Sequence, residues 1–175
     1  MDGNEEAVIL MGHGSRVPDA GQGMETVART LKETGFCGIV EVCYMERQGP
    51  RFGEALAKCV AEGAKRVVLI PYFLHMGLHI RVDIPNMMRH EAEKYPDITL
   101  VFGKNLGYDD LLLELVKKRI GESRQHPDVR KVEPLERETY PLPPEAQVFV
   151  TMSQEEAAEY KEKHGGHCHH HHHGH

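Results

Sequence analysis

The segment Ala7-Val-Ile-Leu-Met11 is an uninterrupted apolar run that leads directly into Gly12-His13-Gly14-Ser15-Arg16. Three further apolar runs follow at near-equal intervals, at Ile39–Tyr44, Val67–Leu74 and Ile98–Phe102. Each run is rich in Val, Ile or Leu and lacks polar alternation, which is typical of strands buried on both faces of a parallel sheet. The sequence therefore predicts four such strands.

Segments with helical periodicity lie between and after these runs. Gly35 is predicted to end the first helix, and Asp83 to cap the third one. Strands alternating with helices predict an α/β fold, an open and mostly parallel four-stranded sheet with helices on both faces. The predicted inward-facing stripes are Met24, Val27, Ala28 and Leu31; Phe52, Leu56, Cys59 and Val60; Ile84, Met87, Met88 and Tyr95; and Leu112, Leu115, Val116 and Ile120.

Composition places the chain among globular proteins, with 40% hydrophobic and 27% charged residues. No apolar run approaches the roughly 20 residues that cross a bilayer, and the start is acidic where a secretory signal is basic. We therefore expect a cytoplasmic protein without a membrane partner. Its net charge of −6 argues against a nucleic-acid partner. Cys37, Cys43 and Cys59 lie within apolar periodic segments and are predicted to be buried, reduced thiols.

The character of the chain changes after Arg124, where several prolines interrupt regular structure. We predict a domain over residues 1–125 and a Pro-rich appendage over 126–175. Within the appendage, Gln147–Thr151 favours a short strand and Ser153–Lys163 a capped helix. The chain ends in a His-rich tail, whose candidate metal-binding residues are His164, His167, Cys168, His169, His170, His171, His172, His173 and His175.

Ligands of open parallel sheets bind beyond the carboxyl ends of the strands. His13 follows the first predicted strand, Glu46 and Arg47 follow the second, and His75 and His79 follow the third. Two strand ends thus deliver imidazoles to one edge of the sheet. Neutral imidazole binds cobalt, nickel, zinc and iron, and two protein ligands leave coordination positions open for metal transfer.

Structural roles are alternatives for several of these residues. A single histidine after a strand is usually an ordinary hydrogen-bonded residue, so the metal hypothesis depends on His13 and His79 together. His75 is either an auxiliary ligand or a packing residue. Glu46 is either functional or an ion-pair partner of Arg47 or Arg51. His90, among charged residues of the third predicted helix, is read as a surface histidine.

Two motifs make the sequence similar to a known family. Gly12-His13-Gly14-Ser15-Arg16, together with Pro71-Tyr-Phe-Leu-His-Met-Gly-Leu-His79-Ile-Arg-Val-Asp-Ile-Pro85, resembles the small sirohydrochlorin chelatases. The resemblance covers about residues 6–121 and implies the class II chelatase fold. It also implies an enzyme, a metal chelatase of the lyase class, that inserts Co²⁺ into sirohydrochlorin in anaerobic cobalamin biosynthesis. Insertion of Ni²⁺ or Fe²⁺ into the same macrocycle is the alternative, and short family members pair as homodimers.

The resemblance assigns roles to matching residues. His13 and His79 correspond to the family's metal-holding histidines and, with Glu46, are the catalytic candidates. The metal is then a substrate, and no permanently bound cofactor is expected. Sirohydrochlorin carries eight carboxylates, so Ser15, Arg16, Arg47 and Arg81 are candidates for binding them.

Other function classes remain as rivals. A metal storage or delivery protein would bind metal without consuming it in a tetrapyrrole-dependent manner. A histidine phosphotransferase is disfavoured, because that chemistry uses an Arg directly before the His and Gly12 occupies this position. The tail is either a purification tag or a natural metal reservoir that feeds the chelatase site, and its irregular His-Gly-Gly-His-Cys start favours the reservoir.

Overall fold

A computed structural model of the chain describes residues 5–134, with gaps at 16, 18–19, 47–48, 76 and 78. The side chain of His79 is also outside the description, although its backbone is within it. The predicted strand Gln147–Thr151, the predicted helix Ser153–Lys163 and the histidine tail lie beyond the described residues.

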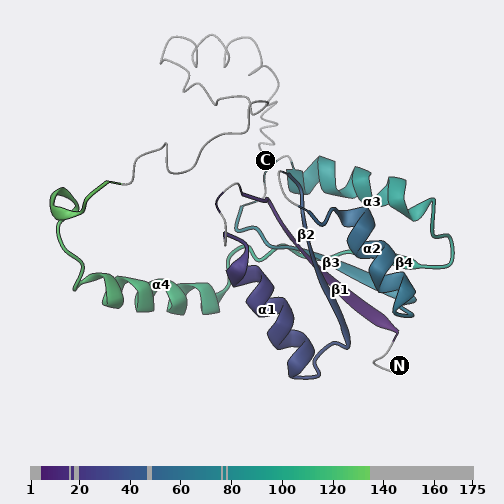
Figure 1. The fold of residues 1–175 in the computed structure, drawn as a ribbon, viewed down its shortest axis with the longest axis horizontal. Helices are drawn as coiled ribbons and strands as arrows, with labels where there is room; N and C mark the ends of the chain where they lie inside the picture. The colour runs from purple at the N-terminus through teal and green to yellow at the C-terminus, as the bar shows by residue number, and fades with distance from the viewer. Residues whose placement is uncertain are drawn as a thin grey trace, which may run out of the picture. The chain divides into compact units, whose positions relative to one another are not determined.

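The described chain contains one four-stranded sheet with the order β2-β1-β3-β4 (Figure 1). Its strands are β1 (Glu6–Gly12), β2 (Ile39–Tyr44), β3 (Arg66–Pro71) and β4 (Thr99–Phe102). All three pairings are parallel, with β1 in the centre between β2 and β3. The predicted α/β class is confirmed, since every carboxyl strand end lies at one edge of this sheet.

The third strand is shorter than the sequence predicts. It was expected over Val67–Leu74 but ends at Pro71, so Tyr72, Phe73 and Leu74 lie in the following loop. The neighbouring strand explains the difference, because β4 ends at Phe102, directly opposite Leu69. Because β4 ends there, residues 72–74 have no partner strand on that side. From this loop Tyr72 and Phe73, both half-buried, still pack against the two core clusters, whereas Leu74 is exposed.

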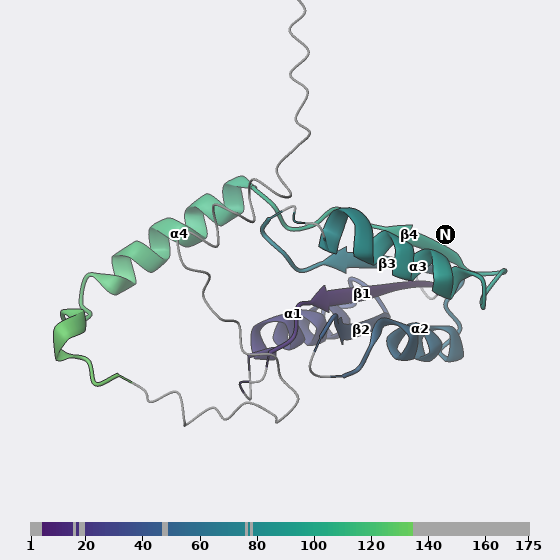
Figure 2. The same ribbon diagram turned by 90° about the horizontal axis from the view of Figure 1, so that it is seen from above.

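Helices cover the two faces of the sheet. Helix α1 (Gln22–Glu33) buries Met24 and Ala28 on one face, where it packs against β1 and β2. Helices α2 (Phe52–Ala61) and α3 (Ile84–Ala92) cover the other face, with Phe52, Leu56, Ile84 and Met88 in its core. Figure 1 shows α1 on one side of the sheet and α2 and α3 on the other, and Figure 2 shows the order of the strands from β4 to β2.

Helix α3 begins differently from the prediction. Asp83 is not its side-chain cap, because a π-helical turn over His79–Asp83 runs directly into α3 and Asp83 already has helical backbone angles. The helical segment therefore starts at His79, and its first amide groups belong to the loop after β3. The backbone of His79 therefore begins the helical segment that follows the loop after β3.

The predicted thiols are buried as expected. Cys37, Cys43 and Cys59 are free cysteines inside the fold. Burial raises the pKa of the Cys43 thiol to about 12, and the neighbouring Cys59 adds to the shift. Burial likewise raises the pKa of Cys59 to about 12. Both groups are protonated packing residues at neutral pH.

Helix α4 (Asp110–Ser123) does not pack as predicted. Its apolar stripe, Leu112, Leu115, Val116 and Ile120, was expected to face the core, yet no residue of α4 is buried. Asp109 caps the helix by accepting a hydrogen bond from the Leu111 amide at 3.0 Å. A 3₁₀ turn over Val129–Lys131 follows and is fully exposed. Within the described residues, none of the helices has the length and apolar character required to cross a membrane.

Candidate functional site

The first histidine motif follows the central strand at the carboxyl edge. The Glu46 amide donates to the His13 carbonyl at 2.9 Å, and the Met45 amide donates to the Gly12 carbonyl at 3.0 Å. These bonds continue the β1–β2 pairing beyond the last strand residues. The backbones of His13 and Glu46, two candidate catalytic residues, are thereby held next to each other.

Gly14 makes this close approach possible. Its φ is +95°, a left-handed conformation that L side chains rarely adopt. A Cβ at this position would overlap the carbonyl oxygen of Glu46. Gly14 is therefore required here, because only glycine permits both the turn and the contact with the second strand end.

The His13 side chain is exposed at a cavity of about 280 Å³. The cavity is formed by the loop after β1, the start of α1 and aromatic side chains from two further strand ends; its lining residues are Gly12, His13, Gly14, Ser15, Ala20, Gly21, Gly23, Met24, Tyr44 and Tyr72. The Ser15 hydroxyl accepts a hydrogen bond from the Val17 amide at 3.1 Å. Ser15 is one of the lining residues, and its contact with a ligand stays a prediction.

Aromatic residues that sequence reasoning missed shape this site. The Phe73 ring meets the His13 imidazole edge to face, with centroids 6.4 Å apart and planes at 70°. Tyr44 lines the cavity, and its hydroxyl donates to the Glu25 carboxylate at 2.7 Å. The available signal was the position of Tyr44, Tyr72 and Phe73 at or just after strand ends. Phe73 was assigned to a strand and therefore not considered.

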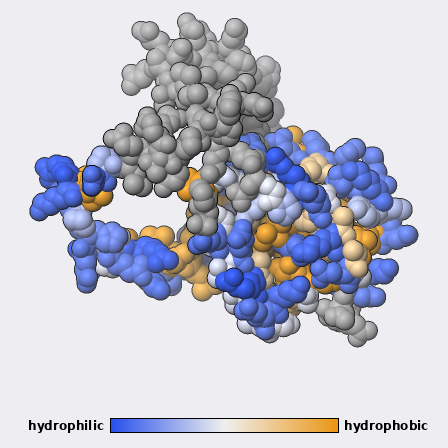
Figure 3. Space-filling model, viewed as in Figure 1, coloured by the Kyte–Doolittle hydropathy of each residue, from blue (hydrophilic) through white to orange (hydrophobic). Residues whose placement is uncertain are grey.

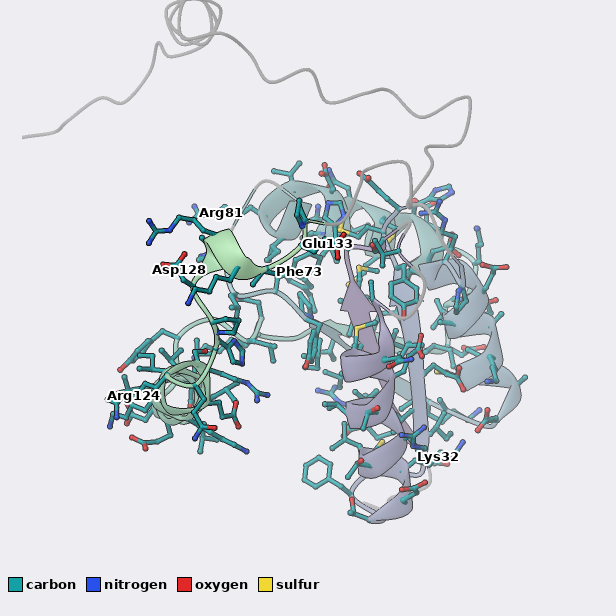
Figure 4. All side chains as sticks on the ribbon, turned by 60° about the vertical axis from the view of Figure 1, so that its left-hand side comes forward. Lys32, Phe73, Arg81, Arg124, Asp128 and Glu133 are labelled. Carbon is teal, nitrogen blue, oxygen red and sulfur yellow. The ribbon has the colours of Figure 1, made fainter. Side chains whose placement is uncertain are left out.

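The loop after β3 carries the second histidine motif. His75 is exposed, and its carbonyl accepts a hydrogen bond from the Gly77 amide at 3.1 Å. Arg81, labelled in Figure 4, is exposed in the π-helical turn. It lines a separate groove with Pro85, Met88 and Arg89. Arg81 therefore borders α3, and the structure does not place it in the His13 cavity.

Several predicted site residues are located only in part. Arg16 and Arg47 are outside the described residues, as is the side chain of His79. The guanidinium of Arg51, proposed as an alternative partner of Glu46, donates to the Met45 carbonyl. Among the side chains that the structure describes, no three His, Cys, Asp or Glu groups form a metal-binding cluster.

Comparison with known proteins places the site in a family context. The CbiX family model matches residues 7–123. The sirohydrochlorin cobaltochelatase of Priestia megaterium is 33% identical over 121 residues, covering 69% of this chain and 39% of the relative. The chloroplastic sirohydrochlorin ferrochelatase of Arabidopsis thaliana is 35% identical over 124 residues, covering 71% of this chain and 55% of the relative.

Relatives of two lengths occur. The chain spans about half the length, or less, of the two relatives above. It covers 96% of the sirohydrochlorin cobaltochelatase of Methanopyrus kandleri, with 34% identity and 67% of this chain matched.

Two solved structures of the protein SirB are also similar to this chain. The sirohydrochlorin chelatase SirB from Bacillus subtilis subspecies spizizenii, in complex with cobalt, matches with a TM-score of 0.63 and 29% identity, covering 67% of this chain and 50% of that one. SirB from Bacillus subtilis with Fe³⁺ matches with a TM-score of 0.63 and 28% identity, and the match covers 70% of this chain and 48% of that one.

Proposed function

This chain belongs to the CbiX family, and from that premise we propose that it inserts a divalent metal, Co²⁺ by preference, into sirohydrochlorin. The observation that carries the proposal is the family match over residues 7–123, which includes all four strands except Glu6, and both histidine motifs. A cobalt complex of the similar SirB supports the choice of metal.

The exposed imidazole of His13 is the residue best suited to hold the incoming ion. It stands on a loop tied to two strand ends, so its backbone is fixed, while its ring is exposed to the cavity. His79 is proposed as the second ligand, because its backbone starts the helical segment directly after the β3 loop. Two imidazoles leave positions open for the pyrrole nitrogens that take over the metal.

The reaction releases two protons for each metal ion that enters the macrocycle, because two pyrrole N–H groups must become ligand nitrogens. A base beside the ring assists this loss. Glu46 is half-buried as a residue, and its backbone adjoins His13. We propose that Glu46 or a histidine not occupied by metal receives these protons.

The His13 cavity is too small to enclose the whole substrate. Its volume of about 280 Å³ lies just below that of small-ligand pockets, which span roughly 300–1,000 Å³. A tetrapyrrole of sirohydrochlorin size would rest across its mouth, with much of the macrocycle outside. A second wall is therefore part of the proposal, supplied by a second copy in a homodimer.

Anaerobic incubation of the full chain with sirohydrochlorin and Co²⁺, followed by absorbance, tests the proposal. The expected result is conversion of the free macrocycle to its cobalt complex, well above the rate without protein. Metal binding without any tetrapyrrole-dependent consumption would contradict chelatase activity and indicate a storage or delivery protein.

Iron insertion is the second candidate. The relative from Arabidopsis thaliana, named as a ferrochelatase, is as similar to this chain as the cobaltochelatases are. Parallel assays with Co²⁺, Fe²⁺ and Ni²⁺ at equal concentration distinguish the metals. A higher kcat/KM with Fe²⁺ than with Co²⁺ would reverse the proposed preference.

A further inference from the structure

The wall of the His13 cavity contains a hydroxyl group bonded to a carboxylate. The Tyr44 hydroxyl donates to the Glu25 carboxylate at 2.7 Å, a distance typical of a charge-assisted hydrogen bond. Tyr44 is the last residue of β2 and lines the cavity, whereas Glu25 belongs to the first turn of α1. The bond therefore connects the cavity wall with this helix.

The two partners differ in their contact with water. Tyr44 is only 4% exposed, whereas Glu25 is exposed. Figure 3 shows hydrophilic residues at the surface over α1, the helix that carries Glu25. The hydrogen bond thus leads from a buried group in the cavity wall to a group in contact with solvent.

Gly21 leaves the space that this pair occupies. It is the N-cap residue of α1, directly before the turn that carries Glu25. A Cβ at position 21 would overlap the Tyr44 hydroxyl and would approach the nearer Glu25 oxygen to 3.0 Å. Because Gly21 has no side chain, the start of α1 can lie close enough to β2 for the bond to form.

The pair begins close to the proposed metal ligand. Tyr44 is paired with Gly12, the residue directly before His13, in the parallel ladder of β1 and β2. A Cβ on Gly12 would lie 3.5 Å from Cδ1 of the Tyr44 ring. Tyr44 and His13 line the same cavity, so a macrocycle across its mouth would cover both residues.

The proposed reaction requires a second proton acceptor. Two protons leave the macrocycle for each metal ion, and a single carboxylate such as that of Glu46 can accept only one of them. A macrocycle across the mouth also excludes bulk water from the cavity. A hydroxyl bonded to a carboxylate can move a proton from such a place, because its oxygen accepts one proton while it gives up another.

We propose that Tyr44 and Glu25 form a proton relay that carries one of the two pyrrole protons out of the cavity. The pyrrole N–H bond breaks as its proton moves to the Tyr44 oxygen, and the original phenol proton moves to the Glu25 carboxylate. The nitrogen keeps the electron pair, with which it binds the metal. Glu25 then releases its proton to water, and rotation of the Tyr44 hydroxyl restores the bond.

The relay rests on the proposed metal insertion and adds two residues to it. Tyr44 meets the substrate, and Glu25 acts through Tyr44. The alternative is a structural bond that only ties α1 to the end of β2. The two possibilities differ in what a substitution at Glu25 must preserve, since a structural bond needs an acceptor oxygen whereas a relay needs a group that takes up a proton.

Isosteric variants of the full chain test the relay. Tyr44→Phe keeps the ring and removes the hydroxyl, while Glu25→Gln keeps an acceptor oxygen but no longer takes up a proton. Each should lower kcat for Co²⁺ insertion by at least about tenfold and leave the KM for Co²⁺ within about twofold of wild type. Circular dichroism should show that both variants are folded.

Two matched controls should keep the wild-type kcat. Tyr108→Phe removes a hydroxyl that donates to the Asp110 carboxylate at 3.3 Å, a pair of the same kind that does not line the His13 cavity. Glu33→Gln removes an exposed carboxylate from the last turn of α1. An equal loss of kcat in either control would overturn the relay.

Chemical rescue separates the relay from a structural bond. Glu25→Ala leaves room for a small carboxylate, so added acetate should raise the kcat of this variant, while chloride at the same ionic strength should not. Wild-type chain in acetate provides the baseline. Wild-type kcat in Glu25→Gln, or no effect of acetate on Glu25→Ala, would show that the bond is structural and overturn the relay.

Equilibrium binding of Co²⁺ without sirohydrochlorin completes the experiment. Tyr44→Phe and Glu25→Gln should bind the ion as wild type does, because the relay acts only when pyrrole protons leave. Weaker binding by Glu25→Gln would assign the carboxylate to the metal and contradict the relay. A wild-type chain that consumes no sirohydrochlorin with any metal would refute the chelatase function, and the relay with it. Wild-type insertion matched by every variant would refute the relay alone.

Discussion

The Phe73 ring packs edge to face against the imidazole of His13, so the loop after β3 contacts the loop after β1. This contact restricts the orientations of an otherwise exposed imidazole. An aromatic pair of this geometry contributes about 0.5–1.5 kcal/mol beyond simple burial. Phe73 is therefore a positioning residue for the proposed metal ligand.

Phe73→Leu should raise the KM for Co²⁺ by roughly two- to tenfold, because the imidazole samples more orientations while the apolar volume is largely kept. Phe36→Leu is the matched control, since Phe36 is 80% exposed and lines none of the pockets described above. Measuring the insertion rate of both variants over a range of Co²⁺ concentrations gives the two KM values. Identical KM values would show that the ring contact does not orient His13.

Replacing His13 or His79 by Ala should lower metal insertion by at least about 100-fold. His13 is exposed, so its removal opens no core cavity and the circular dichroism spectrum should not change. His90→Ala, at an exposed position on α3, should retain the wild-type rate. His75→Ala should have a milder effect if its role is auxiliary. Wild-type turnover by the His13 or the His79 variant would eliminate that residue as a metal ligand.

Gly14→Ala should destabilise the fold by more than Gly63→Ala. Both glycines have nearly the same φ, +95° and +97°, so both alanines carry the left-handed penalty of roughly 1–2 kcal/mol. At Gly63 nothing lies within 4 Å of the added Cβ, whereas at Gly14 it meets the Glu46 carbonyl. Displacing Glu46 endangers its hydrogen bond to His13, which adds about 1 kcal/mol. Urea unfolding of the two variants measures the difference, and equal midpoints would argue against the close approach.

The strands show what a sequence pattern predicts well. Ile39–Tyr44 matches β2 at both ends, because a strand buried on both faces leaves a continuous apolar run. The same rule extended β3 wrongly over Tyr72, Phe73 and Leu74, since hydrophobicity does not reveal that the neighbouring strand has ended.

Contacts between residues that are distant in the sequence could not be predicted. The stripe on α4 was identified correctly as apolar, but periodicity states only that a helix face needs a partner and not where that partner is. At the site, His13 was predicted from its place after the first strand and from the motif that contains it. Its contact with Phe73 joins loops distant in sequence, and no local pattern predicts such a contact.

Stability should fall as the pH rises above about 9, because of Cys43 and Cys59. In the unfolded chain thiols titrate near pH 8.5–9, whereas burial raises both pKa values to about 12 in the fold. Between these values the folded state binds more protons, so the unfolding free energy decreases by up to about 1.4 kcal/mol per pH unit for each thiol. Urea midpoints at pH 8 and pH 10 test this. Cys59→Ala should reduce the pH slope, and an unchanged slope would assign it to other groups.

The last prediction concerns the His-rich tail, which lies outside the described residues. Deleting residues 164–175 should leave turnover unchanged at saturating Co²⁺ but lower it when metal is scarce. Eight histidines and Cys168 close together in the sequence offer many weak sites for borderline metals. Ions held there raise the metal concentration near the chelatase site without changing the chemical step, as a tethered second site does.

Steady-state rates of the full-length and truncated chains, measured over a range of Co²⁺ and Ni²⁺ concentrations, test the role of the tail. A matched control replaces the tail histidines by Ser while keeping its length, so that an effect of chain length is separated from metal binding. The Ser-substituted chain should behave like the truncated one. Equal rates for all three at every metal concentration would reduce the tail to a tag or a passive store. A truncated chain that is inactive even in excess metal would place the tail in the reaction itself.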